Sequence, residues 1–240
     1  MEDGEINSES KVSTGILGLD SLLFGGVPLR NQILVAGSPG TGKTLMTFEI
    51  LYRNAKARIP GVYISFDEHK KSLLENVKSA FSNFEDVDEL IEKNMLVISE
   101  QRILTAYGSK ENFEAFVAGL NKVVKQNSAE VVVLDSLSPM RPLFVNDREF
   151  TRAVNFLVEN FRSLGVTTFI TLETESRNIN NWSITDLLGT YMFDGLIRLN
   201  TVGREGSFQF LIGIVKMRRS NHSNVSMPYE ITSKGINVFK

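Results

Sequence analysis

Short apolar runs alternate with helical stripes along most of this chain, and that alternation limits the possible fold more than any other feature. Between the runs, apolar residues recur at helical spacing, as they do from Phe48 to Ala55. Strands that alternate with helices predict an α/β fold, in which helices flank a mostly parallel central sheet. The runs with the length and apolar content of buried strands are QILVAG (32–37), VYISF (62–66), NMLVIS (94–99), EVVVLD (130–135) and VTTFITL (166–172).

The last of the expected helices has clear end signals, and the chain changes character after it. Asn146 or Asp147 can cap the helix that carries Phe150 to Phe161, and Gly165 can end it. The segments GLIRL (195–199), SFQFLIGIVKM (207–217) and ITSKGINVF (231–239) then read as strands joined by turns. Because no helix separates them, we expect antiparallel C-terminal strands at one edge of the sheet.

Composition narrows the class of protein. The 240 residues are 42% hydrophobic, which suits one α/β core, so we expect a flexible leader at 1–12 and a single domain at 13–240. The absence of cysteine excludes disulfides, thiol catalysis and thiolate metal sites. No apolar run is long enough for a membrane span, and the acidic N-terminus does not read as a signal peptide, so we expect a cytoplasmic protein with no membrane partner. A formal charge of −2 gives no overall attraction to nucleic acid.

The stretch GSPGTGKT matches the phosphate-loop pattern G-x-x-x-x-G-K-[ST]. It follows an expected strand and opens an expected helix, which is the context that phosphate binding requires. Backbone amides of such a loop and the positive helix end cradle phosphates, a lysine reaches the β and γ phosphates, and a hydroxyl ligates Mg²⁺. The loop therefore predicts a site for ATP with Mg²⁺. Its residues are Gly37, Ser38, Pro39, Gly40, Thr41, Gly42, Lys43 and Thr44.

Carboxylates follow two other expected strands. Asp135 ends VVVLD, and a charged group there is costly unless it has a partner, such as the magnesium of a phosphate cradle. Asp67 and Glu68 follow VYISF. Because parallel strands end at the same edge, either carboxylate can face an attacking water beside the loop. The residues alone leave that choice open, and Asp67 can also be a plain helix cap.

Five segments in order, starting with STGILGLDSLLFGGVPLRNQILVAGSPGTGKT, resemble a KaiC-type domain of the RecA/RadA superfamily of ATPases. The others are VYISFDE, VVVLDSLSP, FDGLIRL and KMRRSNHSNVSMPYEITSKGINVF, so the resemblance spans about residues 13–240. It implies a RecA-like P-loop fold, slow Mg²⁺-dependent ATP hydrolysis and a regulatory or signalling role. By position, Glu68 matches the catalytic glutamate with Asp67 as its neighbouring acid, and Asp135 matches the magnesium-site aspartate.

The resemblance also implies residues that act between subunits. In KMRRSNH, Lys216, Arg218 and His222 keep the family spacing K-x-R-x-x-x-H, whose residues reach the neighbour's γ-phosphate in KaiC-type rings. Two cations on one strand face can stabilise a transferring phosphoryl group, but only in subunits that pack head to tail. This predicts a homo-oligomer, either a hexameric ring or a filament. The alternative is a solvated basic turn. His69 is expected at a helix start on the surface.

Relatives with this fold hold single-stranded DNA in two loops, which correspond here to residues 136–147 and 174–189. Neither loop has the excess of basic residues that binding of single-stranded DNA normally requires. The first loop contains Arg141 and Asp147, and the second contains Arg177 with Glu175 and Asp186. Trp182 can stack on a base or serve as a packing contact, and Phe144 lies in an apolar loop that suits an interface. Nucleic-acid binding is thus weakly supported. Two alternatives to an ATPase stay open. The protein can be a binding module in which ATP controls an assembly or the binding of a protein partner, with negligible hydrolysis. It can also be a recombinase-like protein that binds single-stranded DNA.

Overall fold

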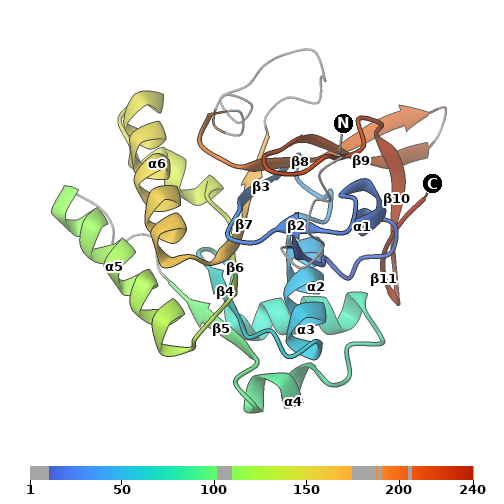
Figure 1. Ribbon diagram of the computed structural model, residues 1–240, viewed down its shortest axis with the longest axis horizontal. Helices are drawn as coiled ribbons and strands as arrows, with labels where there is room; N and C mark the ends of the chain where they lie inside the picture. The colour runs from blue at the N-terminus through green and yellow to red at the C-terminus, as the bar shows by residue number, and fades with distance from the viewer. Residues whose placement is uncertain (1–10, 102–109, 175–187, 189–190, 205–206, 240) are drawn as a thin grey trace, which may run out of the picture.

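The fold is built on one large mixed sheet (Figure 1). The computed structural model describes residues 11–101, 110–174, 188, 191–204 and 207–239. The sheet has nine strands in the order β11-β10-β9-β8-β3-β7-β6-β4-β5. The strands are β3 (Gln32–Gly37), β4 (Gly61–Ser65), β5 (Leu96–Glu100), β6 (Val131–Asp135), β7 (Thr167–Glu173), β8 (Gly195–Arg204), β9 (Ser207–Met217), β10 (Met227–Thr232) and β11 (Gly235–Val238).

Strand direction divides the sheet into two parts. From β5 to β8 neighbouring strands run parallel, and β3 lies between β7 and β8 with Gly37 opposite Glu173 and Leu199. From β8 to β11 each neighbour runs antiparallel. This confirms the expected α/β architecture, with a mostly parallel sheet and antiparallel C-terminal strands. The parallel strands bring their carboxyl ends to one edge, which is where ligands bind in open α/β sheets.

Helices cover both faces of the parallel part (Figure 1). On one face lie α2 (Lys43–Lys56), α3 (Lys70–Ala80) and α4 (Val87–Glu92), and on the other lie α5 (Lys110–Gln126) and α6 (Asp147–Leu164). Two short helices complete the fold, α1 (Leu19–Leu22) and the 3-10 helix η3 (Ser138–Leu143). Since both faces are covered, the central strands can be apolar at every position, as the sequence runs are.

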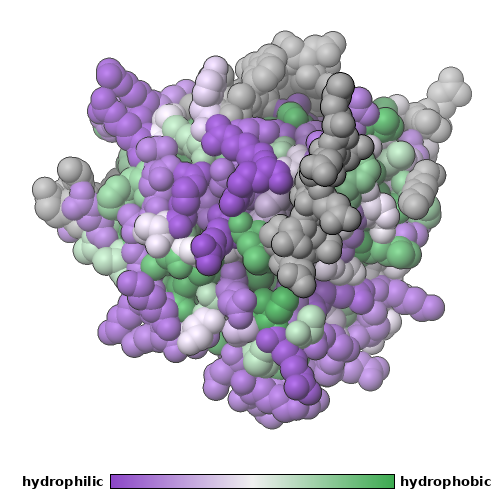
Figure 2. All heavy atoms as spheres, in the orientation of Figure 1, coloured by the Kyte–Doolittle hydropathy of each residue, from purple (hydrophilic) through white to green (hydrophobic). Residues whose placement is uncertain are grey.

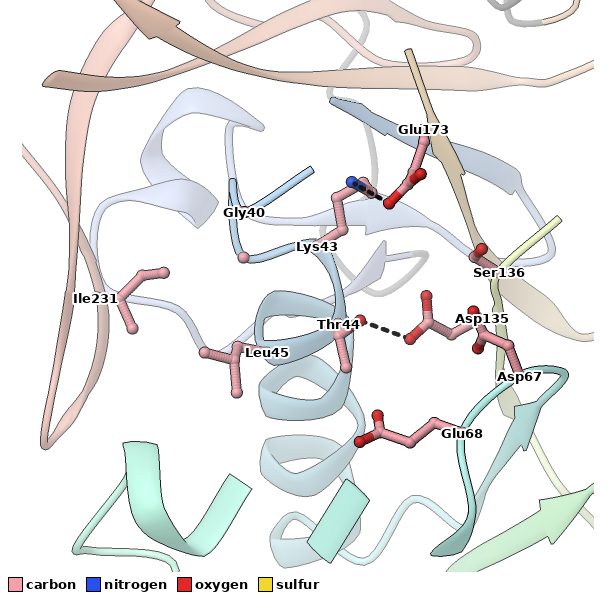
Figure 3. A pocket seen from close by; sticks show the side chains of 11 residues that line it. Gly40, Lys43, Thr44, Leu45, Asp67, Glu68, Asp135, Ser136, Glu173 and Ile231 are labelled. Carbon is pink, nitrogen blue, oxygen red and sulfur yellow. Dashed lines mark hydrogen bonds and ion pairs between the residues drawn. The ribbon is translucent and has the colours of Figure 1, made fainter. Parts of the chain in front are cut away.

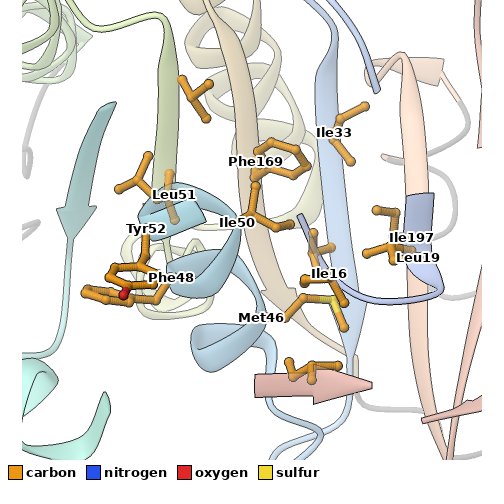
Figure 4. Close-up of a cluster of buried hydrophobic side chains, with 14 of the residues drawn as sticks. Ile16, Leu19, Ile33, Met46, Phe48, Ile50, Leu51, Tyr52, Phe169 and Ile197 are labelled. Carbon is orange, nitrogen blue, oxygen red and sulfur yellow. The ribbon is translucent and has the colours of Figure 1, made fainter. Parts of the chain in front are cut away.

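The alternation of side chains along β3 creates two hydrophobic cores. Ile33 and Val35 point to the α2 side, whereas Leu34 and Ala36 point to the α5–α6 side. In Figure 4, Met46 and Ile50 of α2 pack toward Phe169 and Ile33 of the sheet, and all of these side chains are buried. A fully buried side chain of this size contributes about 1.5–3 kcal/mol to folding. This packing fixes the helix that starts at the GSPGTGKT loop against the sheet.

Helix α6 begins and ends at the residues with the expected signals. The Asn146 side chain accepts a hydrogen bond from the Glu149 amide at 3.0 Å, so Asn146 rather than Asp147 is the cap. Gly165 follows the helix with φ 72°, a left-handed conformation that glycine adopts without steric cost.

Several short elements differ from the sequence prediction. The segment 231–239, expected as one strand, contains the end of β10 and all of β11, with a turn at Ser233 and Lys234 between them. Lys11 and Val12, which the sequence assigned to the flexible leader, form β1 (Lys11–Val12) and pair with β2 (Val27–Pro28). A contact between residues this far apart leaves no local periodic signal. Helices α4 and η3 were also missed, because they are too short to show a clear 3.6-residue period.

One face of the molecule can be seen in a space-filling view. The face in Figure 2, seen as in Figure 1, is mostly hydrophilic, with smaller hydrophobic areas between charged side chains. Within the residues that the structure describes, no helix is both long and apolar enough to span a membrane.

Candidate nucleotide-binding site

The loop between β3 and α2 has the backbone that a phosphate cradle needs. Gly40 and Gly42 adopt φ values of 80° and 79°, which residues with a side chain rarely adopt. The Thr41 hydroxyl donates to the Ser38 carbonyl at 2.8 Å and closes the loop. Helix α2 begins at Lys43, so its positive N-terminal end lies directly behind the loop.

The Lys43 side chain folds back over the loop toward its first residues. Its ammonium donates to the carbonyl oxygens of Gly37 at 2.9 Å and Ser38 at 3.0 Å, and it lies 3.9 Å from the Glu173 carboxylate. Burial lowers the pKa of Lys43, while the charges of Glu173 and Asp135 act to raise it. Those carboxylates keep a cation favourable at this position.

Asp135 is the buried acid of the site, with 7% of its surface exposed. Three hydroxyl groups donate to it: Thr44 at 2.7 Å, Tyr63 at 2.5 Å, and Thr171. These come from α2, β4 and β7, which meet at the end of β6. The cost of burying the charge is thus offset by hydrogen bonds, as expected for a functional strand end. The Asp135–Ser136 peptide bond is cis.

Burial, and then the charge of Asp135, raise the pKa of Tyr63 well above its usual value. Tyr63 therefore stays a neutral donor to the carboxylate. Sequence reasoning missed Tyr63, Thr171 and Glu173. For the first two, the only signal was a hydroxyl side chain within a strand that is expected to be buried.

Asp67 and Glu68 follow β4 and differ in their surroundings. The Glu68 backbone is fixed by Ser65, whose hydroxyl donates to the Glu68 carbonyl at 2.5 Å and accepts from its amide at 3.1 Å. Ser72 donates to Oε1 of the Glu68 carboxylate at 2.7 Å, and Asn76 donates to the same oxygen. Glu68 is therefore held against α3.

Asp67 lies beside Asp135 at the mouth of the site (Figure 3). Desolvation raises its pKa to about 6, helped mainly by the negative charge of Asp135. A carboxyl with a raised pKa next to a second acid in a cleft is a feature of functional sites.

These groups line one cavity of about 490 Å³, a size typical of small-molecule sites. In Figure 3, Asp67, Glu68 and Asp135 lie on one side of Thr44, and Leu45 and Ile231 lie on the other. The two apolar residues were not among the sequence candidates. The cavity is lined by Gly40, Gly42, Lys43, Thr44, Leu45, Asp67, Glu68, Asp135, Ser136, Glu173 and Ile231.

The Thr44 hydroxyl and the Asp135 carboxylate are the oxygen groups of the cavity that fit a magnesium ion. The structure contains no cluster of three or more His, Cys, Asp or Glu side chains that could hold a metal ion among its described residues. The Thr44 hydroxyl and the Asp135 carboxylate do lie together, 2.7 Å apart. Magnesium usually takes one or two protein oxygens and completes its shell with water and phosphate. The pair therefore fits a metal ion that arrives with a nucleotide.

Lys216 and Arg218 lie at the opposite end of the sheet from this cavity. Lys216 donates to the Phe193 carbonyl at 2.6 Å, and the Arg218 guanidinium lies 3.8 Å from the Asp194 carboxylate. Asp194 accepts from the Gln32 amide at the start of β3, whereas the loop follows the end of β3. The six residues of β3 separate its ends by about 17 Å. Neither cation lines the cavity of its own chain.

Comparison with known proteins decides the family. A model of the family described as the KaiC ATPase matches residues 12–240. The chain belongs to the KaiC ATPase family. A UPF0273 protein of Pyrococcus horikoshii is 28% identical over 239 residues, which span 95% of this chain and 94% of that protein.

Two further comparisons describe how this KaiC-family chain relates to proteins of other lengths. The circadian clock protein KaiC2 of Synechocystis is 30% identical over 239 residues, covering 97% of this chain and 41% of that protein. A solved structure of a KaiC-like protein from Pyrococcus horikoshii has a TM-score of 0.81 at 26% identity, covering 96% of this chain and 99% of the other. The chain thus corresponds to one KaiC-like domain.

The remaining sequence candidates of this KaiC-family chain fall outside the cavity. His69 lies at the start of α3 on the surface, as expected, and its side chain pairs with Glu100 at 3.1 Å without capping the helix. The His222 ring lies 2.9 Å from the Ser223 carbonyl.

The structure describes only part of the two loops that correspond to the DNA-binding loops of recombinases, residues 136–147 and 174–189. Arg141 forms an ion pair with Asp147 at 3.1 Å. Phe144, expected at an interface, packs against Phe113 and Phe150 of its own chain. Arg177 and Trp182 lie outside the described residues.

Proposed function

We propose that this chain is an ATPase that binds ATP with Mg²⁺ in the 490 Å³ cavity and hydrolyses it. The observation that carries the proposal is the meeting of Lys43, Thr44 and Asp135 at one strand edge, with the Thr44 and Asp135 oxygens 2.7 Å apart. In this proposal the loop amides from Gly37 to Thr44 and the α2 N-terminus hold the phosphates. Lys43 neutralises the β and γ phosphates.

Thr44 and Asp135 would be the residues that hold the metal ion. When bound, Mg²⁺ supplies charge neutralisation on the β and γ phosphates. The Tyr63 and Thr171 hydroxyls, which donate to Asp135, hold its carboxylate in place beside Thr44. Membership of the KaiC ATPase family supports the nucleotide but does not identify the reaction by itself.

Glu68 is our candidate for positioning the attacking water. Both contacts to its carboxylate use Oε1, so Oε2 can accept a hydrogen bond from water in the cavity. Asp67 is the competing candidate because its pKa of about 6 suits proton transfer near neutral pH. The variants Glu68→Gln and Asp67→Asn separate them. Loss of the positioning group should lower kcat by about 100-fold, and loss of the other by much less.

We further propose that Lys216 and Arg218 complete the site of a neighbouring subunit. They lie beyond the opposite end of β3 from their own loop, so they can reach a γ-phosphate only across a subunit boundary. Head-to-tail packing joins one end of the sheet to the other end in the next subunit, and it closes into a ring or runs as a filament. The proposal predicts that hydrolysis per subunit rises with assembly.

Phosphate release from the purified protein tests the proposal, alongside the mass in solution with and without ATP and Mg²⁺. We expect sustained release that stops when EDTA removes the metal, and a larger mass with the nucleotide. Phosphate release that does not depend on Mg²⁺, or a protein that binds no nucleotide, would contradict the proposal that this chain is a Mg²⁺-dependent ATPase.

One observation favours a second candidate, a nucleotide-gated binding module. Among the described residues, no arginine lines the cavity, so an isolated subunit lacks a cation to stabilise the transferring phosphate. Tight binding without release, even in the assembled state, would support that module.

A further inference from the structure

Strand β10 contacts two consecutive residues of the phosphate loop, Thr41 and Gly42. The Tyr229 hydroxyl donates to the Thr41 carbonyl at 2.5 Å. Two residues further on and on the same strand face, Ile231 lies against Gly42. A Cβ atom added to Gly42 would come within 2.6 Å of Ile231 Cδ1. Tyr229 and Ile231 thus brace the turn in which the loop becomes helix α2.

The hydrogen bond from Tyr229 orients a whole peptide unit. The peptide between Thr41 and Gly42 is trans, since Asp135–Ser136 is the one cis bond among the described residues. In a trans peptide the C=O and N–H groups point in opposite directions. With the Thr41 carbonyl turned toward Tyr229, the Gly42 N–H points away from it. Gly42 lines the cavity, so its amide is directed toward the space where phosphate would lie.

Tyr229 is itself held rigidly. It is 2% exposed, and its ring stacks on Phe210 with a centroid distance of 5.4 Å and an interplanar angle of 24°. Burial raises the pKa of Tyr229, so the hydroxyl stays protonated and can only donate to the carbonyl. Thr41 is completely buried and also ties Ser38 into the loop. The loop therefore cannot easily rotate this peptide while the hydroxyl is present.

We propose that Tyr229 is a positioning residue that sets the Gly42 amide for phosphate binding. It acts through the backbone and does not touch the ligand. Preorganised amides bind an anion more tightly because no ordering cost is left to the moment of binding. This inference rests on the proposed nucleotide site.

The test compares two buried tyrosines that both lose a hydroxyl. Tyr229→Phe keeps the ring and removes the bond to Thr41. Tyr52→Phe is the matched control, because Tyr52 is 1% exposed and its hydroxyl contacts Asn83, Asp86 and Lys56 but no residue of the loop. Calorimetric binding of MgADP should weaken about fivefold in Tyr229→Phe, since one net hydrogen bond is worth about 0.5–1.5 kcal/mol. The control should bind like wild type.

Two further measurements separate positioning from loss of stability. Where hydrolysis is measurable, Tyr229→Phe should raise KM for MgATP about fivefold and leave kcat within about twofold, because the amide contacts phosphate in both ground and transition states. Both variants should lose similar amounts of thermal stability. A loss of affinity shared by the control would mean that only general stability is involved, and would overturn the inference.

Failure of the inference differs from failure of the proposed function. Wild-type binding of MgADP with unchanged binding in Tyr229→Phe would overturn the role of Tyr229 alone. No MgADP binding by wild type would overturn both. If Tyr229→Phe does not fold, Phe210→Leu keeps the hydroxyl but removes the stacking ring, and it should weaken MgADP binding about twofold. Binding equal to wild type would then count against the inference.

Discussion

Two buried aspartates at opposite ends of the sheet have different partners. Asp135, 7% exposed, ends β6 and accepts hydrogen bonds from three hydroxyl groups. Asp194, 8% exposed, precedes β8 and faces two arginines, Arg162 at 3.2 Å and Arg218 at 3.8 Å. Within the described residues, Asp135 forms no ion pair. Its charge is solvated by neutral donors and is left for an external cation.

The difference shows that burial of an acid does not by itself mark a functional site. Asp194 is neutralised by its own chain, so it has the properties of a structural ion pair. Asp135 has no arginine or lysine within ion-pair distance among the described residues and lines a cavity with Lys43 and Thr44. The kind of partner, cation or hydroxyl, distinguishes the two roles, and mutation can test that distinction.

The largest effect is expected at the cavity end. Lys43→Ala removes the one lysine that lines the described cavity, so MgATP affinity should fall by at least about 100-fold. Equilibrium binding with a fluorescent ATP analogue measures it. Lys216→Ala provides the comparison at the other end, and its subunits should still bind the analogue. If Lys43→Ala and wild type bind the analogue equally well, the loop from Gly37 to Thr44 is not the phosphate-binding site.

The aspartates themselves give the next effect. Asp135→Asn should lower Mg²⁺-dependent phosphate release by about 100-fold. The fold should persist, because the amide oxygen can still accept from Thr44 and Tyr63 and the NH₂ group can donate to the Thr171 hydroxyl oxygen. Asp194→Asn should instead lower the free energy of unfolding by about 1.5–3 kcal/mol, since Arg162 loses its hydrogen-bonded carboxylate and keeps only its pair with Glu159. It should leave the nucleotide affinity of the isolated subunit unchanged. Opposite outcomes for the two variants would reverse the assignment of roles.

Arg218→Ala tests whether the two ends meet between subunits. Nucleotide binding should be spared, and kcat should fall at least about tenfold, because the transferring phosphoryl group loses a cation. Arg219→Ala is the matched control, since the Arg219 guanidinium donates to Leu29 and Asn31 of its own chain.

Mixing sharpens this prediction. An Arg218→Ala subunit has an intact loop, and a Lys43→Ala subunit has an intact Arg218. Head-to-tail packing should therefore restore part of the activity when the two inactive variants are combined. A mixture as inactive as its components would contradict a role in trans.

The smallest effect concerns pH. The pKa of Asp67 is about 6 in the fold against an ordinary 3.8, so the folded state holds this proton more tightly than the unfolded chain. Ionisation therefore costs stability as pH rises from about 4 through about 6. Asp67→Asn should raise Tm relative to wild type at about pH 7.5 and have little effect at about pH 4. The gain should be small because Asp67 is only partly desolvated and the solvent on its exposed side screens its charge. A larger gain at the lower pH would contradict the raised pKa.

Local signals predicted a substantial part of the site. The glycines and Lys43 belong to one continuous motif, and Asp135 ends an apolar run, so each could be found without tertiary contacts. Tyr63 and Thr171 could not, since a hydroxyl in an apolar strand acquires a role only when another strand brings Asp135 to it. Ile231 could not be found either, because it reaches Gly42 from the C-terminal strands.

The sequence by itself determined the longer strands and helices, and that GSPGTGKT joins a strand to a helix, because side-chain periodicity and glycine conformations are local properties. Tertiary structure alone decided that β3 lies between β7 and β8, that Asp135 is surrounded by hydroxyl groups, and that Lys216 and Arg218 lie away from their own loop. Those outcomes depend on which distant segments pack together. Packing is settled by burial summed over the whole chain, so no single stretch of residues contains it.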